Sequence, residues 1–375
     1  MSVREQLLQL KKNGWEVRII GATIFDTQNG TTRLKRHWDM MRNARHALVK
    51  IKDGPLVHNL VKTRSTVRSE MTADEEGVWY RLYTRALDRF KPDIVYFYGG
   101  RTLDLLIGDE AHSRGIAVAA YLANGNYSGT RWCRDVDLII TDSHATAGMY
   151  RAKDGIEITP IGPFIDPACV VAPRRQPSRV LAVNPSLAKG AAIVIRLAMM
   201  LEEDRPDIQF EIVRSRGNWE GLVREVTKRF GKARNTLDNV TVTPTTRDMR
   251  PIYGRAKLLL ALSLCWESFG RVAAEAVMNG IPVITTKSGG LPEAAGPQMP
   301  TIDVPHAIKK PPYTQLPSER TIAQLKDIVT GLYDDEARHR SLEHAAKEYA
   351  ENHRIAASTE RLDTALAALL SKTKP

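Results

Sequence analysis

Short apolar runs alternate with longer amphipathic stretches along nearly the whole chain. Apolar runs of about four to eight residues are typical of buried strands, and apolar residues spaced three and four apart are typical of helices. Such alternation favours a parallel sheet with helices on both faces. The pattern therefore predicts an α/β protein.

The alternation occurs twice along the chain. In the first half the predicted strands are residues 16–21, 94–98, 116–122, 138–141 and 156–161. In the second half they are residues 180–183, 208–213, 240–243, 258–261 and 282–285. The helices predicted between these second-half strands cover 190–201, 220–229 and 269–279. Two such series predict two doubly wound, Rossmann-like domains, with ligands in a cleft at the carboxyl ends of the strands.

A proline-rich segment separates the two halves. Residues 167–178 carry three prolines and two adjacent arginines, a composition typical of an interdomain linker. We therefore expect an N-terminal domain over residues 1–166 and a C-terminal domain over residues 179–354. Residues 355–375 have apolar side chains at helical spacing, and this helix is expected to pack back on the N-terminal domain.

The amino-terminal segment departs from the order of elements in such domains. A doubly wound domain opens with a strand, a glycine-containing turn and a helix. Here residues 2–13 already have helical spacing, and Gly14 is expected to end that helix. The first strand is therefore expected to be absent, either because the chain starts downstream of its natural start or because another segment fills the place.

Composition narrows the class of protein further. The 375 residues are 43% hydrophobic and 26% charged, and the longest dense apolar stretch, residues 258–266, is well short of the ~18 residues of a membrane span. The amino terminus carries charges where a signal peptide needs an apolar core. We therefore expect a cytoplasmic protein.

The net charge of +11 is unevenly distributed. Residues 33–68 contain ten basic residues and two acidic ones. A basic face can meet nucleic acid, anionic lipid or an acidic substrate, or it can be an ordinary solvated surface. Because neither interleaved aromatic residues nor a nucleic-acid-binding motif accompanies these charges, we expect no nucleic-acid partner.

The segment with the most candidate chemistry is residues 266–284. It follows an apolar strand and opens a helix for which Ser268 is the expected N-cap. The backbone amides of Phe269, Gly270 and Arg271 would then lie unsatisfied at the helix N-terminus, where the helix dipole also favours an anion. The segment therefore predicts a phosphate site.

Two glutamates flank the start of this helix. Glu267 precedes it and Glu275 lies eight residues further on, so both carboxylates can face one ligand. Carboxylates accept paired hydrogen bonds from vicinal hydroxyls, as a sugar or a ribose presents them. The pair gains specificity from its setting between a strand and Gly280.

These motifs resemble those of the retaining glycosyltransferases of family 4, the glycosyl transferases group 1. The family's Glu-x7-Glu signature matches Glu267 and Glu275, and its phosphate-binding Lys-Gly matches Lys189 and Gly190. The other matching positions are residues 141–143, 161–166, 280–283 and 289–293. The resemblance implies the GT-B fold, in which two Rossmann-like domains face a central cleft.

The resemblance also implies roles for these residues in a hexosyltransferase-type enzyme. Glu267 would bind hydroxyls of the donor sugar, and Lys189 would neutralise the departing diphosphate, a charge that preplaced donors stabilise. Glu275 would bind the ribose. The remaining donor-binding residues would be Ser268, Phe269, Gly270 and Arg271.

The chain departs from the family pattern at two further places. Asn184-Pro185 stands where the family has Gly-Arg, and the arginines that could substitute are Arg196, Arg214, Arg216 and Arg271. On the acceptor side, Asn124 takes the place of a family histidine.

No metal site is predicted. The three cysteines and nine histidines lack metal-ligand spacing. Asp135 and Asp137 resemble the metal-binding Asp-x-Asp of the other large glycosyltransferase fold, but they directly precede a predicted strand.

The sequence thus favours a retaining, metal-independent glycosyltransferase whose donor substrate is a UDP-, GDP- or dTDP-linked sugar, with no other cofactor. The expected acceptor is a cell-envelope glycan or a lipid-linked intermediate, as in polysaccharide or lipopolysaccharide biosynthesis. Because residues 33–68 belong to the acceptor domain, peripheral contact with an anionic membrane at its inner face is also expected. Two alternatives stay open: a nucleotide-sugar-binding partner protein without turnover, and another GT-B enzyme such as an epimerase.

Overall fold

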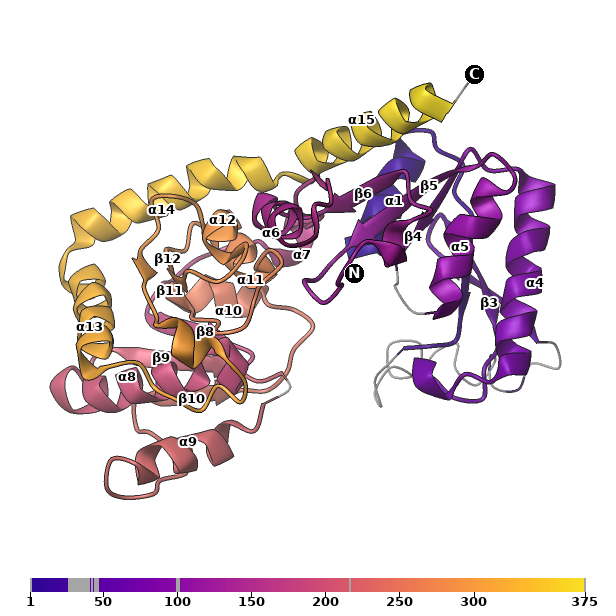
Figure 1. The fold of residues 1–375 in the computed structure, drawn as a ribbon. Coiled ribbons are helices and arrows are strands. Elements are labelled where there is room, and N and C mark those ends of the chain that lie inside the picture. The colour runs from indigo at the N-terminus through magenta and orange to yellow at the C-terminus, as the bar shows by residue number, and fades with distance from the viewer. Residues whose placement is uncertain are drawn as a thin grey trace. The chain divides into compact units, whose positions relative to one another are not determined.

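The computed structural model describes residues 2–25, 41, 43, 47–98, 102–215 and 217–373. They form two compact α/β units (Figure 1). Unit 1 comprises Met1–Leu122, Ser128–Ile140 and Thr359–Pro375, and unit 2 comprises Ala123–Tyr127 and Thr141–Ser358. The expected linker at residues 167–178 falls inside unit 2, so the domain limits drawn from the sequence stay a prediction.

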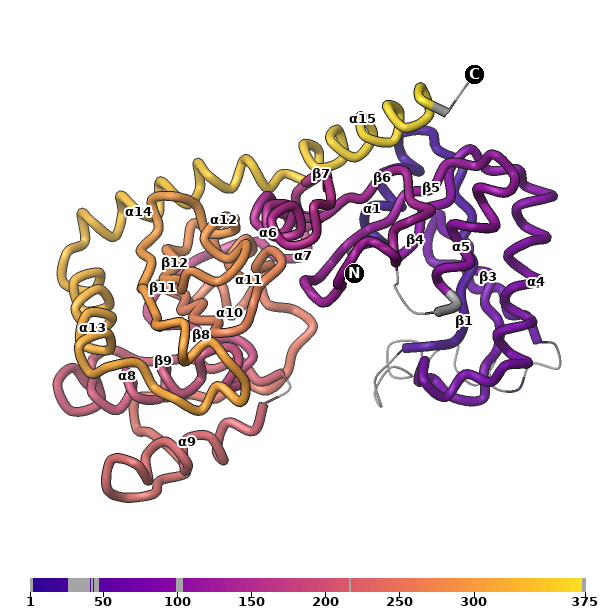
Figure 2. Tube along the Cα trace, viewed as in Figure 1, coloured from indigo at the N-terminus to yellow at the C-terminus, as the bar shows by residue number. Residues whose placement is uncertain are grey.

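Unit 1 contains strands of two sheets (Figure 2). In the first sheet β1 (Ile19–Ala22) pairs in parallel with β3 (Leu56–Val61), which pairs antiparallel with β2 (Leu48–Asp53). In the second sheet β4 (Ile94–Phe97), β5 (Ala117–Leu122) and β6 (Leu138–Thr141) follow in that order. The hairpin of β2 and β3 is not among the predicted strands, whereas the prediction at residues 94–98, 116–122 and 138–141 is confirmed.

One helix layer covers both sheets of unit 1. Tyr83 and Leu87 of α4 (Ala73–Phe90) lie in a core against which Ile20 of β1 and Val95 of β4 pack. Among the described residues β1 pairs with β3 alone and β4 with β5 alone. In a doubly wound sheet the first strand lies between the second and the fourth. This break in pairing therefore falls where such a sheet has its first strand, the strand expected to be absent here.

The other helices of unit 1 agree with the sequence pattern. The helix predicted over residues 2–13 is α1 (Ser2–Lys12). The predicted C-terminal helix is α15 (Ile355–Thr373), most of which belongs to unit 1. The remaining elements are α5 (Thr102–His112) and the 3-10 turns η1 (Arg68–Glu70) and η2 (Arg131–Cys133).

Unit 2 is built on a six-stranded parallel sheet in the order β10-β9-β8-β11-β12-β13. The strands are β8 (Arg179–Val183), β9 (Gln209–Val213), β10 (Val240–Thr243), β11 (Ala256–Ala261), β12 (Val283–Thr286) and β13 (Thr301–Ile302). Val180 stands opposite Phe210 and Leu258 in register. The central strands are mostly apolar, as expected where helices cover both faces of the sheet. The five strands predicted here are confirmed.

The helices of unit 2 form two layers (Figure 1). On one face lie α8 (Ala191–Asp204), α9 (Trp219–Lys228) and α13 (Glu319–Asp334). On the other lie α7 (Pro167–Val170), α10 (Arg250–Arg255), α11 (Arg271–Met278), α12 (Leu291–Ala295) and α14 (Glu336–Ala350). The remaining elements of unit 2 are α6 (His144–Asp154), β7 (Thr159–Pro160), η3 (Leu187–Lys189), η4 (His306–Lys309) and η5 (Glu351–His353).

Within the described ranges, none of the helices combines the length and the apolar character that crossing a bilayer requires.

Candidate functional site

The loop between β11 and α11 brings the predicted site residues to the carboxyl end of a strand. The helix begins at Arg271, and Gly270 is its N-cap, with a left-handed φ of +107°. The prediction that Ser268 caps this helix is therefore wrong, because glycine at position 270 allows a tight left-handed entry without a side-chain cap. The Ser268 carbonyl instead accepts hydrogen bonds from the hydroxyls of Thr146, at 2.9 Å, and Ser143.

Free backbone donors lie at the start of α11. In the described part of the chain no group accepts a hydrogen bond from the backbone amides of Phe269, Gly270 or Arg271. The Phe269 ring is buried in the core below the helix, which fixes this backbone. Unsatisfied amides and the positive end of the helix dipole both favour an anion here.

Lys189 and Glu267 form an ion pair beside this loop. The Lys189 ammonium contacts Oε1 of Glu267, and the two side chains are 30% and 18% exposed. The hydroxyl of Ser263 donates to the same oxygen. Because both donors use Oε1, the other carboxylate oxygen keeps its capacity to accept hydrogen bonds from a ligand. Ser263 is not among the predicted site residues.

A close backbone contact at Gly190 places Lys189. Gly190 has a φ of +77°, and a Cβ at this position would lie 2.1 Å from the carbonyl oxygen of Leu262. The backbone amide of Leu264 donates to the carbonyl of Ala188 at 2.8 Å. The turn at η3 is therefore bound to the loop that carries Glu267, and glycine is required for the approach.

The glycine-rich loop before α12 makes a second close contact. Gly289 has a φ of +55°, and its Cβ would lie 2.1 Å from the carbonyl oxygen of Glu267. The Gly290 amide donates to that same oxygen at 2.7 Å. The loop therefore fixes the backbone of Glu267.

Glu293, in the first turn of α12 after this loop, caps a different helix. Its carboxylate accepts hydrogen bonds from the backbone amides of His144, at 2.9 Å, and Ala145, at 3.0 Å, at the start of α6. Ser143 is the N-cap of α6 and also donates to the Ser268 carbonyl. The start of α6, the loop before α11 and the glycine-rich loop thus hold one another in place.

Glu275 lies one helical turn after Arg271 and is 7% exposed. Its Oε1 accepts a hydrogen bond from Nε of Arg271 at 2.6 Å, and its Oε2 accepts one from the Tyr253 hydroxyl at 2.7 Å. Burial and the adjacent Glu275 charge hold the pKa of Tyr253 well above its usual value, so the hydroxyl stays protonated and donates. Sequence reasoning missed Tyr253, since no periodicity links it to Glu275.

Asn124 lies in a turn against the residue that precedes Glu267. Its side-chain oxygen accepts from the amide of Asn126 at 3.0 Å, which is an Asx-type turn. A Cβ on Gly125 would lie 3.2 Å from the ring of Trp266, which is 45% exposed. Asn124 thus lies near the loop, but its side chain serves the turn.

The candidate arginines occupy different places. Arg196 pairs with Glu319 at 3.0 Å, and Arg214 pairs with Glu220. Arg216 lies outside the described residues. Among the three candidates that the structure describes, Arg271 alone stands at the N-terminus of α11.

The two aspartates of the Asp-x-Asp sequence serve local structure. Asp135 pairs with Arg134 at 2.7 Å. Asp137 accepts a hydrogen bond from the amide of Val118 at 2.8 Å, directly before β6. Both positions agree with the prediction of a strand entry.

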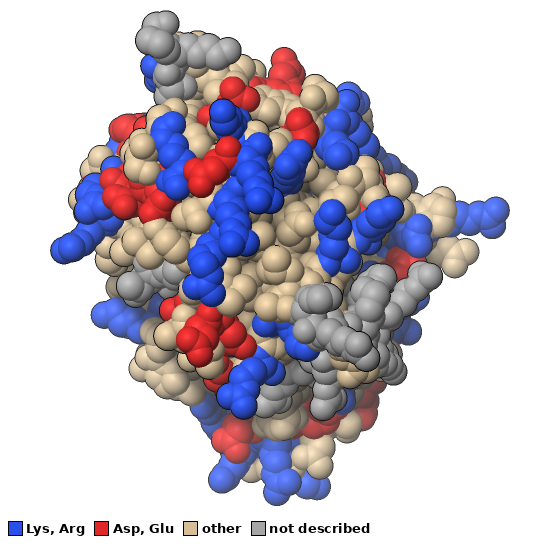
Figure 3. Space-filling model, turned by 90° about the vertical axis from the view of Figure 1, so that its right-hand side faces the viewer, with Lys and Arg blue, Asp and Glu red and all other residues tan. Residues whose placement is uncertain are grey.

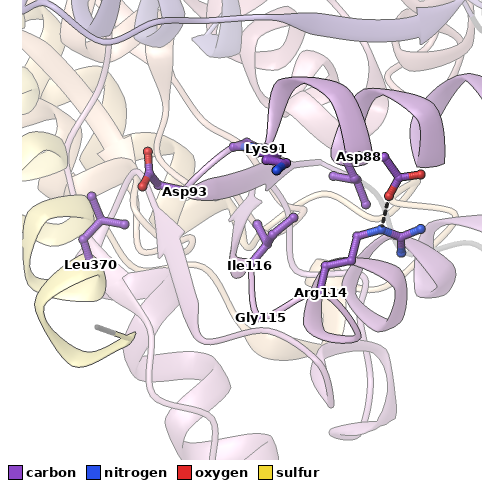
Figure 4. Close-up of a pocket in the computed structure, with 9 residues that line it drawn as sticks. Asp88, Lys91, Asp93, Arg114, Gly115, Ile116 and Leu370 are labelled. Atoms are coloured by element: carbon purple, nitrogen blue, oxygen red, sulfur yellow. Dashed lines mark hydrogen bonds and ion pairs between the residues drawn. The ribbon is translucent and has the colours of Figure 1, made fainter. Parts of the chain in front are cut away.

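None of these residues lines the pocket of about 440 Å³ in unit 1. Pro92 and Asp93 precede β4, Gly115 and Ile116 precede β5, and Arg114 pairs with Asp88 at 2.8 Å on its rim (Figure 4). The pocket thus lies where the strands begin, whereas ligands of doubly wound sheets bind where strands end. We therefore place the candidate site at the loops of unit 2.

Comparison with known sequences identifies part of the chain. Residues 180–302, about a third of its length, match the family described as Glycosyl transferases group 1. A D-inositol 3-phosphate glycosyltransferase of Pseudarthrobacter chlorophenolicus is 29% identical over 171 residues, 44% of this chain and 36% of the relative. The enzyme of that name from Segniliparus rotundus is 28% identical over 184 residues, 44% of this chain and 40% of the relative. The matches thus span less than half of either protein.

Solved structures resemble the chain over nearly its whole length. A glycosyltransferase of Rickettsia africae has a TM-score of 0.68 at 13% identity, over 98% of this chain and 94% of that one. The Anabaena protein HepE, crystallised with UDP, has a TM-score of 0.67 at 15% identity, over 97% of this chain and 95% of that one. These neighbours are GT-B glycosyltransferases. The chain therefore has the expected GT-B fold, and its residues 180–302 match the Glycosyl transferases group 1 family.

Proposed function

We propose that this protein is a retaining glycosyltransferase that moves a sugar from a nucleotide-sugar donor to an acceptor. The observation that carries the proposal is the convergence of Lys189, Glu267 and the free amides at the start of α11, all inside the matched residues 180–302. A cation, free amides and a carboxylate are the groups that a diphosphate and a sugar require.

The donor in this proposal is a sugar linked to UDP, GDP or dTDP. Support comes from the HepE structures, which hold UDP, UDP with glucose, or UDP-glucose. Because those structures share only the fold with this chain, the base and the sugar are matters for experiment.

The proposed chemistry breaks the bond between the anomeric carbon and the diphosphate oxygen, and the electron pair leaves with the diphosphate. A hydroxyl oxygen of the acceptor forms the new bond to the anomeric carbon, and its proton passes to the departing diphosphate. Lys189 and the amides of Phe269 and Gly270 then stabilise charge that grows on that oxygen. Glu267, with one oxygen held by Lys189 and Ser263, turns the other toward sugar hydroxyls. Glu275 takes the ribose, and no residue in this scheme requires a metal ion.

The proposed acceptor is anionic, either a cell-envelope glycan or a lipid-linked intermediate. The curated relatives are named for an anionic compound, D-inositol 3-phosphate. Arg81, Arg85 and Arg89 are exposed four residues apart along α4, and Lys50 and Lys52 are exposed on β2. Basic side chains also spread widely over the face drawn in Figure 3.

A lipid-linked acceptor would bring the chain to an anionic membrane, as the basic stretch 33–68 suggests. Arg33, Lys35, Arg36, Arg42 and Arg45 of that stretch lie outside the described residues. Sedimentation with phosphatidylcholine vesicles, with and without phosphatidylglycerol, tests the contact. Binding that ignores both the anionic lipid and the salt concentration would exclude an electrostatic membrane contact.

A thermal-shift panel of UDP-, GDP-, dTDP- and CMP-sugars, without added metal, tests the donor proposal. A ligand at 100 times its dissociation constant adds about 2.7 kcal/mol of stability, which is a shift of several degrees in a chain of this size. No shift with any donor, in a protein that unfolds cooperatively, would contradict the proposal. Conversion of a donor without an acceptor would instead indicate an epimerase, and binding without transfer would indicate a partner protein.

A further inference from the structure

Tyr253 contributes a buried hydroxyl that the proposed chemistry does not yet use. We propose that Tyr253 is a positioning residue, whose hydroxyl acts with the Arg271 guanidinium to fix the Glu275 carboxylate as the acceptor for the vicinal hydroxyls of ribose. The inference rests on the proposed function and concerns the same donor site.

The carboxylate is held from two different helices. Tyr253 belongs to α10 and is fully buried, while Arg271 and Glu275 belong to α11. Each carboxylate oxygen accepts one hydrogen bond, at 2.7 Å from Tyr253 and 2.6 Å from Arg271. Because the two donors approach different oxygens, the carboxylate cannot rotate without breaking one of the bonds.

The hydrogen-bond capacity of the carboxylate fits a diol. An ionised carboxylate has about four acceptor sites on its two oxygens, and Tyr253 and Arg271 occupy one on each. One site on each oxygen is left, which matches the two adjacent hydroxyls of a ribose. Because Glu275 is 7% exposed, only a small part of this residue is accessible to a ligand.

The charges around Glu275 also favour a nucleotide. A nearly buried anion one turn from the amides at the start of α11 would weaken the attraction of those amides for a diphosphate. Arg271 balances that negative charge and leaves the amides available. Asn279 donates from its side chain to the Glu275 carbonyl at 2.8 Å and to the Val170 carbonyl at 3.1 Å, which fixes the backbone of that turn.

The test measures ribose discrimination by calorimetry. The probes are UDP and GDP, each with its 2′,3′-dideoxy counterpart, and dTDP, whose deoxyribose carries a single ring hydroxyl and no vicinal pair. The wild-type protein is expected to bind the tighter of UDP and GDP at least about tenfold more tightly than its dideoxy counterpart, the effect of one charge-assisted hydrogen bond or more. Tyr253→Phe removes only the buried hydroxyl and is expected to reduce that ratio about threefold or more.

A matched control separates positioning from stability. Tyr83 in unit 1 is also buried, and its hydroxyl donates to a carbonyl oxygen, that of Ile107, at 2.7 Å. Tyr83→Phe loses an equivalent buried hydrogen bond and is expected to keep the wild-type ratio. Because both nucleotides of a pair carry the same diphosphate, a general weakening of phosphate binding cancels in the ratio.

The outcomes distinguish this inference from the function on which it rests. Nucleotide binding by Tyr253→Phe with the wild-type ratio would overturn the role of Tyr253 and leave the proposed function intact. A wild-type protein that binds nucleotide without discrimination would overturn the roles of both Tyr253 and Glu275 in ribose binding and leave the proposed sugar transfer intact. A wild-type protein that binds none of the three nucleotides would overturn both proposals. Should Tyr253→Phe not fold, Arg271→Gln at the helix surface takes its place in the test. A lower ratio of affinities for a nucleotide and its counterpart would support the inference, and an unchanged ratio would refute it.

Discussion

Replacing Gly289 with alanine perturbs the contact that sets the backbone of Glu267. A Cβ at position 289 would lie 2.1 Å from the Glu267 carbonyl oxygen, and real Cβ contacts under 3.0 Å are essentially never seen. The Gly290 amide donates to the same oxygen at 2.7 Å. The loop at Gly289 and the backbone of Glu267 can therefore separate only by straining this hydrogen bond. Movement of Glu267 also displaces its carboxylate from Lys189.

The expected loss of stability in Gly289→Ala has two parts, which a control variant separates. Gly289 has a φ of +55° and Gly155 a φ of +65°, but a Cβ on Gly155 would meet nothing within 4 Å. Gly155→Ala thus carries only the cost of left-handed backbone, about 1–2 kcal/mol. Gly289→Ala adds overpacking of about 1–3 kcal/mol, for a loss of about 2–5 kcal/mol in the free energy of unfolding.

Urea unfolding measures the stability of both variants, and a donor-consumption assay measures their activity. Gly155→Ala is expected to keep its transfer rate, because Gly155 ends α6 far along the chain from the loop before α11. Gly289→Ala is expected to lose about 100-fold in rate, the effect of a displacement of about 1 Å at a reacting site. Equal losses of stability in the two variants, with equal rates, would refute the conclusion that Gly289 positions Glu267.

Two further predictions concern charged groups. Burial alone would raise the pKa of Glu211, but hydrogen bonds from Arg255 and Thr243 hold it below its usual value; Arg255→Gln should therefore lose about 1.5–3 kcal/mol of stability at neutral pH. A carboxylate with a lowered pKa stabilises the fold at pH values above its pKa in the unfolded chain, about 4.3. Urea unfolding of Arg255→Gln should therefore show the loss of stability at pH 7 and a smaller loss at pH 3. A loss that does not depend on pH would contradict its assignment to the Glu211 carboxylate. Lys189→Met should lower kcat by about 100-fold or more, since it removes a preplaced positive charge at the leaving diphosphate. Lys287, whose side chain is 62% exposed and pairs with Asp303, provides the control: Lys287→Met should retain wild-type kcat in the same steady-state assay.

The strands of unit 2 could be predicted from the sequence because its central strands are buried on both faces. Val180, Phe210 and Leu258 lie side by side in three such strands. Val180 and Leu258 belong to continuous apolar runs, and Phe210 lies in a short run rich in apolar residues, which can be recognised without tertiary information. The hairpin of β2 and β3 escaped prediction for the opposite reason. On β2 the exposed side chains alternate with buried ones, so the lysines dominate the sequence pattern, which indicates a charged surface and not a strand.

The start of α11 shows where local propensity gives the wrong answer. Serine is a favoured N-cap, and Ser268 stands directly before an apolar helical pattern. Its carbonyl is instead fixed by Ser143 and Thr146, more than a hundred residues earlier in the chain. Gly270 can adopt a left-handed φ at no steric cost, so the helix begins after it.

The sequence by itself determined the α/β class, the strand series of unit 2 and the residue types of the candidate site, because these depend on local apolar periodicity and on side chains close together in the chain. Only the tertiary structure decided which groups meet. Lys189 and Ser263 share one oxygen of Glu267, and Tyr253 reaches Glu275 from another helix. Such contacts depend on how the ends of parallel strands converge and on close approaches at glycines, and neither leaves a periodic mark in the sequence.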